Sequence, residues 1–161
     1  MRGMPCLLMI AAITVTPAET RAIERGPLPA LTLTNLAGAA VTTVPSATDG
    51  AWLILYVQAD CSRCDQILDA TRQDKHSRLA ARLTVIVAGA RRAELEAVAA
   101  RFPHLPRGAF YTDPARSVLT RLKLPGVPVV IGLRGRTMEW SLSGVADVAA
   151  MESVLASWVA Q

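Results

Sequence analysis

The sequence predicts an α/β fold in which helices flank a central mixed β-sheet, with a β-hairpin added at the N-terminal side. The first observation is the order of patterns over residues 51–159, which runs strand, helix, strand, helix, then a hairpin and a closing helix. The second is that residues 51–58 form a continuous apolar run, which is typical of a strand covered on both faces, and that residues 83–88 read as a second buried strand. Of 161 residues, 52% are hydrophobic, which is enough to form the core of one domain.

The first elements follow from local patterns. Residues 31–35 alternate apolar and polar side chains and are followed by a bend near Gly38 and a second short run at 39–43, which predicts the hairpin. The turn at Asp49 and Gly50 leads into the strand at 51–58. Residues 62–79 show helical spacing, and 83–88 form the second buried strand.

The second half of the chain reads in the same way. A helix at 92–102 ends before Pro103, and a short strand follows at 109–112. Asp113 and Pro114 are typical of a helix cap and first turn, and that helix reaches about residue 122. Residues 127–133 and 137–142 predict an antiparallel hairpin, and 147–159 an amphipathic helix. Right-handed crossovers would make the first strands of the sheet parallel.

Residues 1–22 are typical of a secretory signal peptide. Arg2 precedes an apolar run at 6–15, and cleavage after Ala22 or Ala18 would fit the small residues there and remove Cys6. The run is shorter than the about 20 residues that a spanning helix needs, although an uncleaved signal would leave a membrane tether. We therefore expect a signal at 1–22, a linker at 23–30 and one exported domain at 31–161.

Cys61 and Cys64 stand two residues apart where the strand at 51–58 gives way to a helix. A vicinal dithiol at such a junction favours redox chemistry. A purely structural disulfide would close a very small loop and contribute only about 2 kcal/mol in the chain-entropy estimate. A zinc site would require His76 and His104, but their spacing does not match zinc-finger ligands and exported thiols compete with oxidation. We expect no metal.

The charge distribution argues against nucleic acid as a partner. The formal net charge is +4, and the arginines are scattered along the chain without interleaved aromatic residues. The scattered arginines are more simply interpreted as a basic surface exposed to solvent. We expect a monomer that meets other proteins.

Several motifs together resemble the thioredoxin superfamily, and most closely its exported TlpA-like thiol:disulfide oxidoreductases. The resemblance covers nearly all of residues 28–160 and is carried by the strand that runs into Cys61-Ser-Arg-Cys64, by Tyr111-Thr-Asp-Pro114, by Lys123-Leu-Pro-Gly-Val-Pro128-Val-Val with Leu133-Arg-Gly-Arg136, and by the leading Leu28-Pro-Ala-Leu-Thr-Leu-Thr-Asn-Leu-Ala-Gly38. It implies a thioredoxin-like fold whose only redox group is the Cys61–Cys64 disulfide, with no other cofactor.

The resemblance also implies roles for individual residues. Cys61 would be the attacking thiol and Cys64 the resolving thiol, while Pro128 would be a cis-proline that leaves the Val127 backbone free to pair with a substrate chain. Arg63 would favour the Cys61 thiolate and Asp60 would oppose it. The chain departs from thioredoxin at two places: Asp60 replaces the usual tryptophan, and Leu55 stands where thioredoxin has a buried aspartate.

Three functions remain open at this point. The first is a reductase of client disulfides in the bacterial periplasm, for example in cytochrome c or metalloprotein maturation, which a membrane thiol electron donor regenerates. The second is an oxidase or isomerase of the same fold. The third is a non-enzymatic module that delivers Cu(I) or docks a partner.

Overall fold

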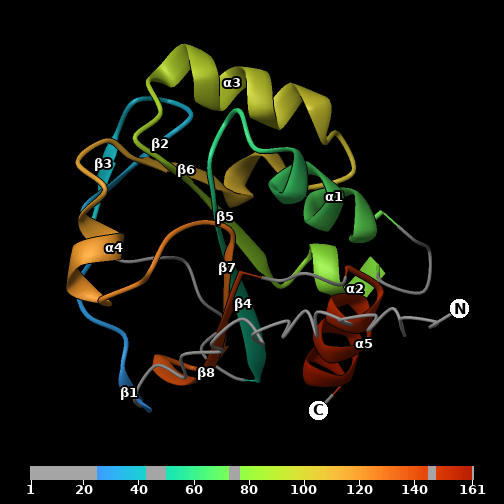
Figure 1. The fold of residues 1–161 in the computed structure, drawn as a ribbon. Helices are drawn as coiled ribbons and strands as arrows, with labels where there is room; N and C mark the ends of the chain where they lie inside the picture. Colours follow the sequence, from blue (N-terminus) through green and yellow to red (C-terminus); the bar gives the residue numbers. More distant parts are fainter. Residues whose placement is uncertain (1–24, 43–49, 73–76, 145–147, 161) are drawn as a thin grey trace, which may run out of the picture.

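The computed structural model describes residues 25–42, 50–72, 77–144 and 148–160. Figure 1 shows one central sheet with helices on both of its faces. The sheet has eight strands in the order β1-β8-β7-β4-β5-β6-β2-β3. The strands are β1 (Gly26–Pro27), β2 (Leu33–Asn35), β3 (Ala40–Val41), β4 (Ala51–Val57), β5 (Leu83–Ala88), β6 (Phe110–Asp113), β7 (Val129–Arg134) and β8 (Thr137–Ser143). The helices are α1 (Ser62–Ala70), α2 (Ser77–Ala80), α3 (Arg92–Arg101), the short 3-10 helix η2 (Arg107–Ala109), α4 (Ser117–Arg121) and α5 (Val148–Val159).

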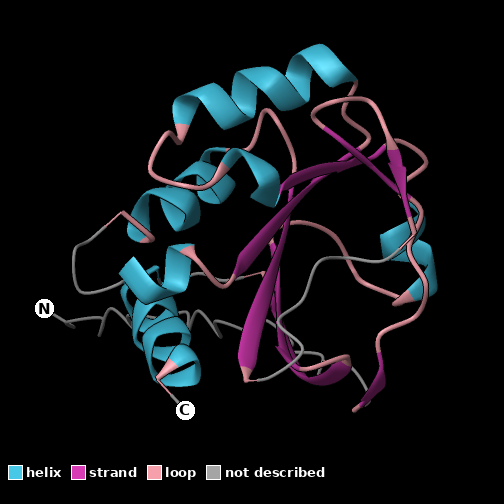
Figure 2. Cartoon of the chain, turned by 180° about the vertical axis from the view of Figure 1, so that it is seen from behind, coloured by secondary structure: helices cyan, strands magenta, loops and turns pink. Residues whose placement is uncertain are grey.

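The sheet is mixed, as predicted. Strands β4, β5 and β6 are parallel, whereas β7 and β8 run antiparallel to each other and β7 runs antiparallel to β4. Side chains of β4 alternate between two cores: Leu55 packs in the core beneath α1, α3 and α5, and Ile54 packs in the core beneath α4. Figures 1 and 2 show α4 on the opposite side of the sheet from α1 and α5. Both faces of β4 are therefore buried, which explains its continuous apolar sequence.

The predicted N-terminal hairpin is present as β2 and β3, which pair antiparallel. Asn35 closes the turn: its backbone carbonyl accepts from the Gly38 amide at 2.9 Å and its side-chain oxygen from the Ala39 amide at 2.9 Å. Gly38 has φ +84°, a left-handed conformation that glycine adopts without steric cost. Gly26 and Pro27, which the sequence placed in a linker, form β1 and pair with β8. The predicted signal peptide lies outside the described residues.

The helix predicted over residues 62–79 is shorter in the structure. Helix α1 ends at Ala70, and α2 is a separate short element. The Thr71 hydroxyl donates to the Leu68 carbonyl at 2.7 Å, so a side chain takes an acceptor that a further helical amide would otherwise use. Helical periodicity in the sequence does not reveal such a side-chain cap.

Helix α4 begins later than predicted. The sequence placed its start at Asp113 and Pro114, but Asp113 ends β6 and α4 begins at Ser117. Asp113 still caps the helix, because its carboxylate accepts from the Ser117 and Val118 amides at 2.9 and 2.8 Å. Arg116, with φ 53°, makes the turn that brings these amides back to the carboxylate.

Strands β7 and β8 pack through a glycine. Gly132 faces the Trp140 indole so closely that a Cβ atom at Gly132 would overlap the ring. The Trp140 indole thus lies directly on the β7 backbone, where it covers the sheet near α5.

None of the helices in the described ranges is long and apolar enough to cross a membrane.

Candidate functional site

The two cysteines lie at the junction of β4 and α1 and form a disulfide with a Cα–Cα distance of 5.2 Å. Cys61 is the N-cap of α1, and its sulfur accepts a hydrogen bond from the Cys64 amide at 3.2 Å. Cys64 is fully buried, whereas Cys61 is only partly buried. A sulfur at a helix N-terminus faces amide donors and the positive end of the helix dipole, which together favour a thiolate.

The buried side of the disulfide is apolar. Cys64 belongs to the core that also contains Leu55, Val57 and Val130. Leu55, which the sequence resemblance matches to the buried aspartate of thioredoxin, is 1% exposed. The Leu55 side chain therefore offers no group that could exchange a proton with Cys64.

The Val127–Pro128 peptide bond is cis, and Pro128 is buried immediately before β7. The register of β4 and β7 pairs Tyr56 with Val129, so Pro128 lies at the edge of the sheet where β4 ends, toward Cys61. The Pro128 carbonyl accepts from the Gly144 amide at 3.4 Å. Within the part of the chain that the structure describes, the Val127 backbone makes no hydrogen bond.

The two residues expected to tune the thiol, Asp60 and Arg63, are both exposed beside Cys61 in sequence. Neither forms a hydrogen bond or ion pair with another residue in the described ranges.

Arg101, at the end of α3, is a residue of the site that the sequence interpretation missed. Its guanidinium donates to the Asp65 carboxylate at 2.7 Å and to the Ala59 carbonyl at 2.9 Å. No sequence motif joins Arg101 to the dithiol, because 36 positions separate it from Asp65. Only the packing of α3 beside α1 brings them together.

His104 lies at the C-terminal end of α1, away from the cysteines at its N-terminal end. Its Nε2 lies 2.9 Å from the Thr71 hydroxyl and 3.3 Å from the Leu68 carbonyl. The buried Nδ1 has no partner among the described residues, and burial lowers the pKa of the imidazole. The zinc alternative required His104 to join Cys61 and Cys64, and this placement does not allow it; His76 lies outside the described residues.

Beneath α4, Tyr56 and Asp113 form a buried polar pair that joins β4 to the helix preceding Pro128. Asp113, which is 0% exposed, accepts from the Tyr56 hydroxyl at 3.0 Å in addition to the α4 amides. Burial and the Asp113 carboxylate raise the pKa of Tyr56. Tyr56, the β4 residue that pairs with Val129, is thus fixed to the start of α4.

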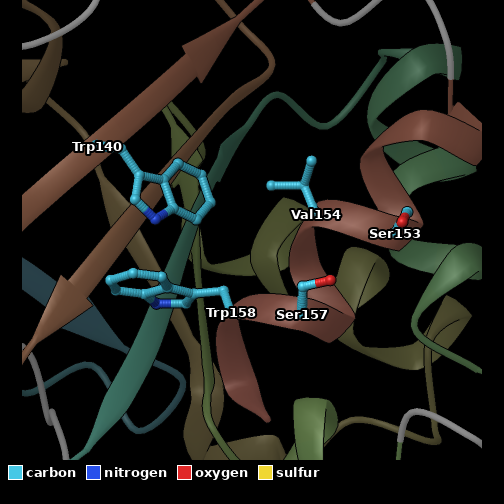
Figure 3. Close-up of a pocket in the computed structure, with 5 residues that line it drawn as sticks. All are labelled: Trp140, Ser153, Val154, Ser157 and Trp158. Atoms are coloured by element: carbon cyan, nitrogen blue, oxygen red, sulfur yellow. The ribbon is translucent and has the colours of Figure 1, made fainter. Parts of the chain in front are cut away.

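A hollow of about 280 Å³ lies between β8 and α5 (Figure 3). Trp140 and Trp158 form one wall, with their rings edge to face at 5.5 Å, and Val154 lies opposite. The Trp158 ring nitrogen donates to the Trp52 carbonyl at 3.2 Å, so the hollow is bounded by side chains that anchor α5 to the sheet. None of its lining residues is a predicted site residue.

No protein-family model and no curated protein matches the sequence. Solved structures do match. An uncharacterized thioredoxin-like protein from Porphyromonas gingivalis is similar with a TM-score of 0.60 and 16% identity over 83% of this chain and 92% of that one. A secreted Mycobacterium tuberculosis disulfide oxidoreductase homologous to E. coli DsbE is similar with a TM-score of 0.56 and 13% identity over 80% and 96%.

The reduced N-terminal domain of PilB from N. meningitidis is also similar, with a TM-score of 0.54 and 15% identity over 76% of this chain and 90% of that domain. At these identities the likeness shows the fold and leaves the client and the direction of electron flow open. The chain has a thioredoxin-like α/β fold, with its Cys61–Cys64 disulfide at the start of α1.

Proposed function

We propose that this chain is an exported, TlpA-like thiol:disulfide oxidoreductase that reduces disulfides in client proteins. The observation that carries the proposal is the asymmetry of the dithiol. Cys61 is partly exposed and caps α1, whereas Cys64 is 0% exposed behind it. The Cys61 sulfur can therefore react with a client disulfide while the Cys64 sulfur stays buried in the protein.

The chemistry follows from this asymmetry. In the reduced protein, the Cys61 thiolate attacks one sulfur of a client disulfide, which forms a mixed disulfide and releases one client thiolate. Cys64 then loses its proton, and its thiolate attacks the Cys61 sulfur. The Cys61–Cys64 disulfide closes, the second client thiol leaves, and two electrons have passed to the client. A membrane thiol electron donor would reduce the pair again.

The charges around Cys61 favour the reducing direction. A strong oxidant needs a strongly stabilised thiolate, because that stabilises its reduced form. Here Asp60 and Asp65 offset Arg63 and Arg101, so the positive charge near Cys61 is balanced. The helix N-terminus then supplies a moderate stabilisation by itself.

A client segment would dock at Val127. The amide and carbonyl of Val127, which make no hydrogen bond within the described residues, lie beside Pro128 at the edge of the sheet where β4 ends. An extended client chain can pair with such a backbone and present its disulfide to Cys61. The predicted signal at residues 1–22 supports a bacterial periplasmic location for this reaction, and we propose that the protein acts there as a monomer, either released or held by an uncleaved signal.

Trapping tests the assignment of the two thiols. Cys64→Ser should accumulate a covalent adduct with client proteins through Cys61, seen as a band that dithiothreitol removes. Cys61→Ser is the matched control and should trap much less. If Cys61→Ser traps as well as Cys64→Ser, the proposed roles are wrong.

A redox titration tests the direction of electron flow. A reduction potential of about −270 mV would support the reductase, whereas one above about −150 mV would identify an oxidase.

A further inference from the structure

Arg101 connects α3 to both sides of the segment that carries Cys61. One guanidinium nitrogen donates to the Asp65 carboxylate at 2.7 Å and the other to the Ala59 carbonyl at 2.9 Å. Ala59 precedes Cys61 by two positions and Asp65 follows it by four. The same guanidinium lies 5.7 Å from the Phe102 ring centroid, which limits its movement. A single side chain thus fixes the loop before Cys61 to the first turn after it.

This contact also affects the charge that a Cys61 thiolate would meet. Asp65 belongs to the first turn of α1, and its amide bonds to the Cys61 carbonyl at 3.1 Å. An unpaired carboxylate there would repel the thiolate and raise the pKa of the Cys61 thiol. The Arg101 guanidinium pairs with that carboxylate and replaces the repulsion by a near-neutral pair.

The other charged groups around Cys61 do not substitute for this pair. Asp60 and Arg63 are its exposed neighbours on the same segment. From the elements packed against α1, α3 contributes Arg101, and α5 has Glu152 as its one charged residue. The segment 124–130, which leads into β7, has no charged residue.

We propose that Arg101 is a positioning residue of the dithiol, which holds residues 59–65 in place and neutralises Asp65 so that the reduced protein favours the Cys61 thiolate. The proposal rests on the proposed function in one respect, namely that Cys61 is the reactive thiol. A role confined to stability would leave the titration of Cys61 unchanged, so titration is the property to measure.

The experiment measures the rate at which iodoacetamide alkylates Cys61 in the reduced full chain between pH 4 and 10, with peptide mass spectrometry to separate Cys61 from the other cysteines. In Arg101→Gln, the apparent pKa of Cys61 should rise by about half a unit or more, which slows alkylation at neutral pH by about threefold. Arg101→Lys should recover part of the shift, because it restores the charge but not the second hydrogen bond.

The matched control is Arg72→Gln, because Arg72 forms an exposed ion pair at 3.1 Å with Asp69, which lies on α1 as Asp65 does. Its Cys61 titration should equal that of the wild type. If Arg101→Gln also titrates like the wild type, the proposal is overturned.

Asp65→Asn keeps the test decisive even if Arg101→Gln does not fold. It leaves Arg101 in place without its anionic partner, so the pKa of Cys61 should fall below the wild-type value; an unchanged or raised pKa would refute the charge argument. The double variant Arg101→Gln/Asp65→Asn should titrate close to the wild type. These titrations do not depend on turnover. Failure of the trapping experiment would therefore reject the oxidoreductase, and unchanged titrations would reject only the role of Arg101.

Discussion

The Tyr56 hydroxyl donates a hydrogen bond of 3.0 Å to the Asp113 carboxylate, and both residues are fully buried. Tyr56 lies in β4 and Asp113 at the end of β6, with β5 between them in the sheet. The bond therefore joins β4, the strand that leads to Cys61, to the residue that caps α4, the helix that precedes Pro128. A buried carboxylate needs such donors because it has lost its water.

Removing this donor should destabilise the fold. Tyr56→Phe leaves the Asp113 carboxylate with one donor fewer, and the free energy of unfolding should fall by about 1 to 3 kcal/mol. Urea unfolding followed by circular dichroism measures the change. Tyr111→Phe is the control, since Tyr111 is also a buried residue but its hydroxyl has no hydrogen bond among the residues the structure describes. Equal losses in both variants would show that the Asp113 contact contributes nothing.

The close contact between Gly132 and the Trp140 indole predicts that a side chain at position 132 destabilises the fold. In Gly132→Ala the new Cβ would overlap the Trp140 indole, so the ring or strand β7 must shift. Overpacking of this kind should lower the free energy of unfolding by about 1 to 3 kcal/mol. Gly108→Ala is the control, because nothing lies within 4 Å of its Cβ position. The double variant Gly132→Ala/Trp140→Leu should recover part of the loss; a Gly132→Ala protein as stable as Gly108→Ala would contradict the packing described.

The partial burial of His104 predicts that the free energy of unfolding depends on pH. Burial lowers the pKa of His104 in the folded state, so the unfolded chain binds a proton first as the pH falls below about 6.5. Stability should therefore be constant above that pH and should decrease as the pH falls toward the folded-state pKa. His104→Gln keeps a donor near the Thr71 hydroxyl and the Leu68 carbonyl but cannot titrate. Urea unfolding at pH 7.5 and pH 5 should show a smaller loss for this variant than for the wild type. Parallel losses would mean that His104 does not titrate between these values.

The proposed docking at Val127 predicts that a variant at this position slows the reduction of protein disulfides more than that of small disulfides. Val127→Pro removes the amide that we propose pairs with a client chain, so kcat/KM for a protein disulfide should fall about tenfold relative to Val127→Ala. Reduction of a small aromatic disulfide, which needs no such pairing, should change less. Equal rates on protein disulfides for the two variants would argue against docking at this backbone.

The sequence predicts the order of elements well where hydrophobic patterns extend over whole strands. Strands β4 and β5 are buried along their length, and the apolar run of β4 and the largely apolar sequence of β5, interrupted only by Thr84, indicate this directly. The dithiol and its junction are equally visible, because Cys61 and Cys64 are local in the chain.

The misses have a common cause. Helix α1 ends early because the Thr71 side chain bonds to the Leu68 carbonyl, and α4 starts late because the Asp113 side chain reaches beyond an Arg116 turn. Arg101 reaches the site only through tertiary packing. Each depends on where one side chain points, which residue spacing does not encode.

The two outer strands of the sheet, β1 and β3, have two residues each. Pro27 in β1 also lacks an amide hydrogen. Short borders of this kind offer a second polypeptide few groups for unwanted lateral association, which limits aggregation. Under the proposed function, the short edge strands would also favour selective contact with clients, because an unrelated chain could form few hydrogen bonds with them.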